Sequence, residues 1–86
     1  MPEDDDRRLI APDGLSIRRR RHDKRWSARD LVGAIAEASY RATGRRDTIT
    51  PDELRGIEER GERIAFATLR LVARGLDCDP VDILRD

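Results

Sequence analysis

The residues with the clearest capacity for chemistry are arginines, and they gather in two clusters. One cluster runs from Arg18 to Arg21 and continues with Lys24 and Arg25, and the other is the pair Arg45 and Arg46. Guanidinium groups bind phosphate oxygens through paired N–H donors, so such clusters are typical of surfaces that contact a nucleic-acid backbone. A solvated helix face is the alternative interpretation of the same residues.

The total charge of the chain hides these clusters. Lysine and arginine number 18, aspartate and glutamate also number 18, and the formal net charge is zero. Acidic residues, however, concentrate within residues 1–8 and 77–86. When the eight acids and three bases of these two ends are left out, the middle keeps 15 bases and 10 acids, a net charge of +5. A neutral total therefore does not exclude a nucleic-acid partner.

The sequence offers no catalytic or metal-binding set. Cys78 and His22 are the only cysteine and histidine, so neither a disulfide within the chain nor a cysteine metal cluster can form. No serine or cysteine nucleophile has supporting neighbours, and no glycine-rich phosphate loop is present. We therefore expect a protein that is not an enzyme and that carries no metal and no cofactor.

Two other classes of partner are disfavoured by composition. Aromatic residues make up 3% of the chain, which argues against single-strand binding by stacked bases. No apolar stretch approaches the ~18 residues of a membrane span, and the first residues, MPEDDD, lack the charge and apolar segment of a signal peptide. We expect no membrane contact and a cytoplasmic location.

The apolar periodicity predicts one all-α domain of five short helices. The expected helices span about residues 16–24, 28–43, 51–60, 65–75 and, after Asp79-Pro80, a short last helix up to Leu84. Ser27 with Asp30 gives the second helix a capped start, and Gly44 ends it. Thr50, Pro51 and Glu53 form the start signal of the third helix, with a cap, a first-turn proline and a capping box.

The expected domain organisation is simple. Residues 1–14 are predicted to be a flexible acidic N-terminal arm that ends in the turn signal Pro12-Asp13-Gly14. A short extended piece at Leu9-Ile10-Ala11 is the alternative within this arm. Residues 15–86 are predicted to form the folded domain.

At this point the sequence resembles the lambda-repressor-like (XRE) helix-turn-helix family. Three stretches carry the resemblance: IRRRRHDKRWSARDLVGAI (17–35), ITPDELRGIEERGER (49–63) and ATLRLVARGLDCDPVDIL (67–84). The last is similar to the closing segment of the family, with spaced apolar residues before and after an Asp-Pro pair. The matching residues there are Leu69, Ala73, Leu76, Asp79, Pro80 and Leu84.

The resemblance implies a DNA-binding face at the starts of the second and third helices. The helix start at Ser27 would hold a phosphate, the start of the third helix would read bases in a major groove, and arginines after that helix would touch the flanking backbone. The expected DNA-binding residues are Ser27, Ala28, Arg29, Arg41, Arg45, Arg46, Thr50, Pro51, Asp52, Arg55, Arg60 and Arg63.

The chain departs from the family pattern in two ways. Family members join the second and third helices by a tight turn, whereas here roughly a dozen extra residues intervene, from Ala36 to Thr48. The base-reading face is also poor in donors, because Arg55 is its one good donor, with guanine as the natural target. Arginines of the insertion are therefore expected to take over some contacts, with a solvated helix extension and loop as the alternative.

Two functions follow from these observations. The first is a sequence-specific regulator of transcription that binds double-stranded DNA, with a homodimer or a partner regulatory protein as a further expectation. The second is a degenerate helix-turn-helix module that binds a protein, as an adaptor, antiactivator or antitoxin-like partner, and no longer reads DNA. The acidic start of the third helix, the neutral total charge and the enlarged turn favour the second function.

Overall fold

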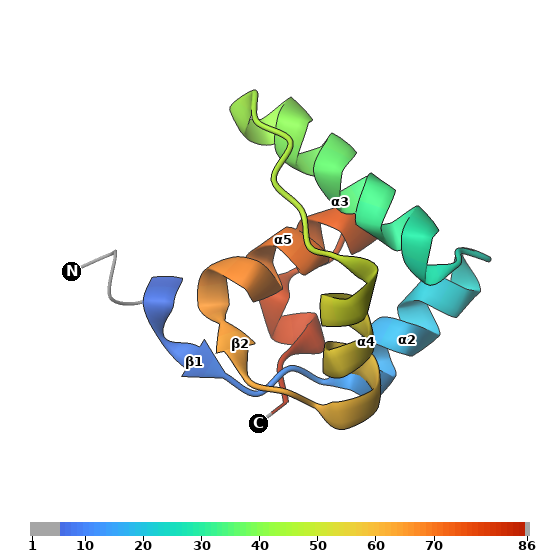
Figure 1. Cartoon of the computed structure of the whole chain (residues 1–86), viewed down its shortest axis with the longest axis vertical. Coiled ribbons are helices and arrows are strands. Elements are labelled where there is room, and N and C mark those ends of the chain that lie inside the picture. Colours follow the sequence, from blue (N-terminus) through green and yellow to red (C-terminus); the bar gives the residue numbers. More distant parts are fainter. Residues whose placement is uncertain (1–5, 86) are drawn as a thin grey trace.

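The computed structural model describes residues 6–85 of the chain (Figure 1). Four α-helices, a two-stranded sheet and one turn of 3-10 helix lie between residues 9 and 83. In chain order they are β1 (Leu9–Ile10), α2 (Gly14–Asp23), α3 (Ala28–Thr43), α4 (Pro51–Arg60), β2 (Ile64–Ala65), α5 (Phe66–Leu76) and the 3-10 turn η1 (Pro80–Ile83).

The capping signals in the sequence set the starts of the helices. Ser27 Oγ accepts from the backbone N–H of Asp30 at 3.1 Å, and the Asp30 carboxylate accepts from the backbone N–H of Ser27 at 2.8 Å. Thr50 and Glu53 form the same reciprocal pair ahead of α4. Gly44 ends α3 in the left-handed conformation, with φ of 80°. The predicted bounds of α3 and α4 are therefore confirmed. Helix α2 begins at Gly14, two residues earlier than predicted, because Asp13 caps it.

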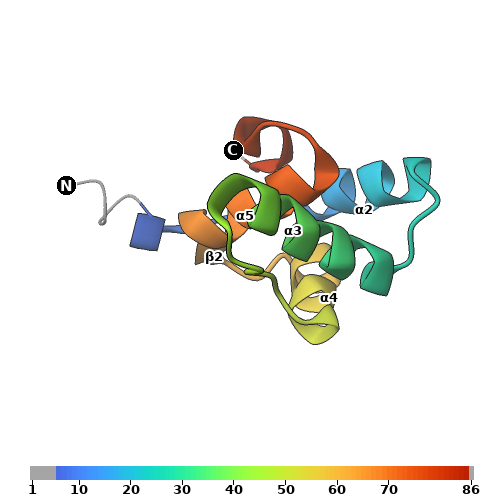
Figure 2. The ribbon, with the colours of Figure 1, turned by 90° about the horizontal axis from the view of Figure 1, so that it is seen from above.

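A small apolar core holds the helices together around α5. Figure 2 shows α4 standing out from the layer of α3 and α5, at the lower edge of that view. The core side chains are at most 8% exposed. They are Ile10, Ile17, Leu31, Ile35, Ile49, Leu54, Ile57, Leu69, Val72, Ala73, Leu76 and Ile83.

The structure corrects two predictions: the fold is not all-α, and the domain does not contain five α-helices. Strands β1 and β2 pair antiparallel, with Leu9 opposite Ala65 and Ile10 opposite Ile64. Two-residue strands are too short to produce an alternating pattern, so periodicity could not reveal them. The predicted last helix is the single 3-10 turn η1, because the chain is extended again at Leu84, where it bridges to Pro12.

The second half of the predicted flexible arm is also part of the folded domain. Three backbone N–H groups secure it: Phe66 donates to Arg8 O, Arg85 to Ala11 O and Asp13 to Ile83 O, at 2.8–2.9 Å. Residues 8–13 thus run between β2 and the C-terminal segment. The acids Glu3, Asp4 and Asp5 of the arm lie outside the described residues.

Among the helices that the structure describes, none is both long enough and apolar enough to cross a membrane.

Gly75 allows a close approach of α5 to α3. A Cβ atom added to Gly75 would lie 3.0 Å from Ile35 Cα and 2.5 Å from Ile35 Cγ1, closer than such atoms normally approach. Gly33, on the exposed side of α3, has no atom within 4 Å of the same position.

The change Gly75→Ala is expected to lower the free energy of unfolding by about 1–3 kcal/mol, because α5 must move away from α3. Gly33→Ala is the matched control, and it is expected to raise that free energy by roughly 0.5–1 kcal/mol, since alanine restricts the unfolded chain and meets nothing in the folded one. Urea denaturation of both variants measures the difference. Equal effects of the two changes would contradict the close approach.

Candidate nucleic-acid interface

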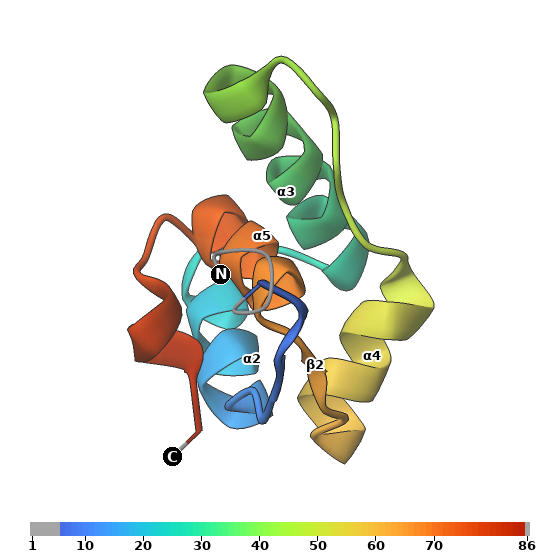
Figure 3. The same ribbon diagram turned by 90° about the vertical axis from the view of Figure 1, so that its left-hand side faces the viewer.

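The starts of α3 and α4 lie side by side on one side of the molecule. All three ribbon views place the first turn of α4 next to the first turns of α3 (Figures 1, 2 and 3). The hydroxyl of Thr48 donates to Val32 O at 2.7 Å and so joins the chain just before α4 to the beginning of α3. Ser27, Ala28, Thr50 and Pro51 therefore fall in one region, as the sequence predicted.

The segment that replaces the short turn is ordered along α3, and we name residues 44–50 the strap. Ser39, which is 1% exposed, donates through Oγ to Arg45 O at 2.7 Å and accepts from the backbone N–H of Asp47 at 3.2 Å. The hydroxyl of Thr43 accepts from the backbone N–H of Arg45 at 3.1 Å. The insertion thus consists of extra turns of α3 and a fixed return segment, and Figure 3 shows this segment descending beside α3 to α4.

The predicted arginines of the insertion lie at the far end of α3 (Figure 1). Arg46 is held there by an ion pair of 2.6 Å with Glu37, and its guanidinium carbon lies 5.1 Å from the centre of the Tyr40 ring. Arg41 is exposed, and the Arg45 side chain is 78% exposed. These three residues form a group separate from the helix starts.

The outward face of α4 carries more acids than bases. Asp52, Glu53 and Glu59 are exposed on this helix, as are Arg55 and, at its end, Arg60, which makes three acids against two bases. The Arg55 guanidinium lies 3.9 Å from Asp52 and 3.6 Å from Glu59. Its charge is therefore balanced by two carboxylates of its own helix.

The remaining predicted residues occupy the flanks of this face. Arg29 is exposed in the first turn of α3. Arg60, at the end of α4, lies 3.3 Å from Glu62, and Arg63 is exposed just before β2. Gly56 of α4 is buried and does not belong to the exposed face.

The first arginine cluster does not form a single basic surface, because Arg21 points into the molecule. Its Nε and Nη2 donate to the two carboxylate oxygens of Glu58 at 2.8 and 2.7 Å, and Nη1 donates to Trp26 O at 2.9 Å. The side chains are 11% and 6% exposed. The hydrogen bond to Glu58 raises the pKa of Arg21, so this guanidinium group stays charged. Sequence reasoning missed this role, because no pattern links residues 37 positions apart.

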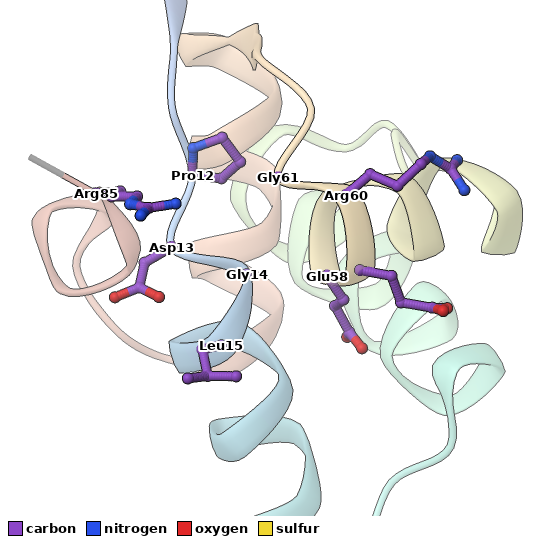
Figure 4. Close-up of a pocket in the computed structure, with 9 residues that line it drawn as sticks. Pro12, Asp13, Gly14, Leu15, Glu58, Arg60, Gly61 and Arg85 are labelled. Carbon is purple, nitrogen blue, oxygen red and sulfur yellow. The ribbon is translucent and has the colours of Figure 1, made fainter.

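A hollow of about 420 Å³ lies between the start of α2 and the end of α4, lined by charged residues (Figure 4). Two of its carboxylates already have partners, since Asp13 caps α2 and Glu58 binds Arg21. Gly14 lets the two helices meet here, because a Cβ atom would overlap the Ile57 carbonyl oxygen. The hollow is a helix junction, and we assign no ligand to it.

No group of three or more metal-ligating side chains occurs among residues 6–85. Burial raises the pKa of the Cys78 thiol, which keeps the sulfur protonated at neutral pH.

Comparison with known proteins adds no relative. No protein-family model matches the chain, and neither a curated protein nor a solved structure matches it.

The change Glu58→Ala is expected to lower the free energy of unfolding by about 3–5 kcal/mol, because it leaves the Arg21 guanidinium buried without its counter-charge. Glu59→Ala removes the same charge from the next residue, which is exposed, and is expected to change that free energy by less than about 0.5 kcal/mol. Thermal and denaturant unfolding compare the two variants. A loss of similar size in both would show that the buried pair contributes no more than an exposed carboxylate.

Proposed function

We propose that this chain is a sequence-specific regulator of transcription that binds double-stranded DNA through a lambda-repressor-like helix-turn-helix. In this proposal it acts in the cytoplasm, is not an enzyme and needs no cofactor. The observation that carries the proposal is the side-by-side placement of the capped starts of α3 and α4, with the α4 face exposed. Mostly helical structure with a small core and short connections is compatible with such a domain.

Helix α4 would enter a major groove. An α-helix with its side chains is about 10–12 Å across, and the major groove of B-DNA is about 12 Å wide. Arg55, 62% exposed, would donate to O6 and N7 of a guanine. The free amides in the first turn of α3, at Ala28 and Arg29, would hold a backbone phosphate. Arg60 and Arg63 would meet the backbone beyond the other end of α4.

The acidic side chains on α4 would increase the specificity of DNA binding. Asp52 and Glu59 repel phosphates, which weakens binding to unrelated sequences, whereas Asp52 accepts a hydrogen bond from the amino group of a cytosine. Arg55 would exchange its two weak carboxylate contacts for a paired contact with guanine. These ion pairs are exposed and therefore cost little to break.

The ordered strap gives the insertion a role in this proposal. Arg46 is held by Glu37 and Tyr40, and Arg41 and Arg45 lie on the same end of α3. A fixed group of arginines would contact backbone phosphates away from the bases read by α4. A second copy of the chain or a partner regulatory protein would supply a second half-site.

A protein-binding function is the second candidate, and the charge of the α4 face favours it. Three exposed acids outnumber the two exposed bases on this helix, and two of them flank Arg55. A basic surface on a partner protein would complement such a face, and charge complementarity of this kind determines partner choice.

The change Arg55→Ala separates the two candidates. If α4 reads DNA, affinity for the duplex that the protein prefers falls by about 1–3 kcal/mol, and discrimination is lost at one base pair only. Fluorescence anisotropy with that duplex and its single-base variants measures both quantities. Arg18→Ala, on the exposed side of α2, is the matched control and should leave affinity within about two-fold, as expected of a surface charge without a contact.

Uniform weakening at every base pair would make Arg55 a backbone contact and remove its reading role. Identical DNA binding by Arg55→Ala and the unchanged protein would overturn the DNA-reading proposal and favour the protein partner.

A further inference from the structure

A second group of arginines surrounds a hollow between the strap and α5. The hollow measures about 380 Å³, and Figure 3 shows the two segments that border it, the strap and α5. Its lining residues are Arg45, Asp47, Ala67, Arg70, Leu71 and Arg74. Arg45 is the one residue that this hollow shares with the proposed DNA contacts of the insertion, and the reading of bases by α4 does not depend on the hollow.

Three guanidinium groups come to this place from two parts of the chain. Arg70 and Arg74 stand four residues apart on α5, so they are neighbours on one face of that helix. Arg45 reaches the hollow from the strap, whose backbone Ser39 fixes. Like charges at this spacing repel one another, which makes the group unfavourable unless an anion lies among them.

One carboxylate from outside the lining of the hollow already binds one of its arginines. The carboxylate of Asp6 accepts a hydrogen bond from Nη2 of Arg70 and forms an ion pair with it. Arg70 also lies over the Phe66 ring, with its guanidinium carbon 5.6 Å from the ring centre, and this contact fixes the orientation of the donors. Asp47 is the second carboxylate, at 3.7 Å from Arg45. Two carboxylates against three guanidinium groups leave a net charge of +1.

Arg74 and Arg45 retain donors for a ligand. Arg74 is exposed and has no ion pair with any residue within the range 6–85. The contact of Arg45 with Asp47 is long, and its side chain is 78% exposed. Planar guanidinium groups bind the tetrahedral oxygens of phosphate through paired hydrogen bonds.

We infer that Arg45, Arg70 and Arg74 form a phosphate-binding site and that Asp6 is its internal competitor. A phosphate group that enters the hollow takes the Arg70 donors from Asp6 and gains those of Arg45 and Arg74. The phosphate group belongs either to a DNA backbone or to a free phosphate ion or ester. Phosphate binding at this site goes beyond the proposed DNA reading and does not require it.

The test uses the full chain, labelled with ¹⁵N, and inorganic phosphate as the probe. Arginine Nε–H signals are followed by NMR while sodium phosphate replaces sodium chloride at constant ionic strength and pH 7. The signals of Arg45, Arg70 and Arg74 are expected to shift and saturate together. Arg74→Gln should weaken this binding by roughly five- to ten-fold, the size expected for the loss of one typical hydrogen bond.

The change Asp6→Asn should act in the opposite direction, because it removes the competitor. Phosphate affinity is expected to rise by about two- to five-fold, the range of an exposed ion pair. Asp23→Asn and Arg18→Gln make the same changes of charge on α2, and both should leave the affinity unchanged. A folding defect cannot imitate a gain of affinity, so Asp6→Asn keeps the test decisive even if Arg74→Gln is unstable.

A DNA titration with Arg74→Gln identifies the source of the phosphate. If the hollow holds a backbone phosphate, the slope of log affinity against log salt concentration decreases by about 1. Saturable phosphate binding with an unchanged slope identifies a free phosphate or ester. The site is overturned if inorganic phosphate gives no saturable shift and the slope is also unchanged. A protein that binds phosphate here but no DNA leaves the site standing and removes only the proposed DNA reading.

Discussion

The buried ion pair between Arg21 and Glu58 is the interaction on which the arrangement of helices depends. It joins the end of α2 to the inner side of α4, and the third guanidinium nitrogen binds Trp26 O in the turn that leads into α3. Because a buried charge without its partner is strongly unfavourable, these three elements take one relative position. The exposed face of α4 points outward as a consequence, since its opposite face is bound to α2.

Capping residues act within a few residues of a helix end, and they predicted the helix bounds well. Features that depend on contacts between distant parts of the chain could not be predicted in this way. Ser27, Thr50 and Gly44 act on backbone groups within a few residues, so α3 and α4 were placed correctly. The sheet, the closure of residues 8–13 and the role of Arg21 depend on partners far along the chain. In the sequence Arg21 is one member of a basic run, but its burial removes it from any basic surface.

The structure separates the predicted DNA-binding residues into groups that lie in different places. Ser27, Ala28, Thr50 and Pro51 come together as predicted, whereas Arg41, Arg45 and Arg46 lie at the remote end of α3. Ser39 explains this division, because its hydroxyl fixes the strap along α3. Ser39 follows Leu31 and Ile35 at four-residue spacing, which places it on the buried side of α3, but this spacing does not reveal its partners in the strap. The charge balance of the α4 face, by contrast, follows from spacing within one helix, because Asp52 and Glu59 stand three and four residues from Arg55.

The central claim is that the exposed start of α4 reads double-stranded DNA. Selection of duplexes from a random library with the purified chain, followed by affinity measurements across salt concentrations, tests it most directly. If α4 reads DNA, we expect an enriched motif that contains guanine and a log affinity that falls steeply with log salt concentration, with a slope that counts the phosphate contacts. Recovery of no motif, together with weak binding even at low salt, would contradict the claim and leave the acidic face of α4 to a protein partner.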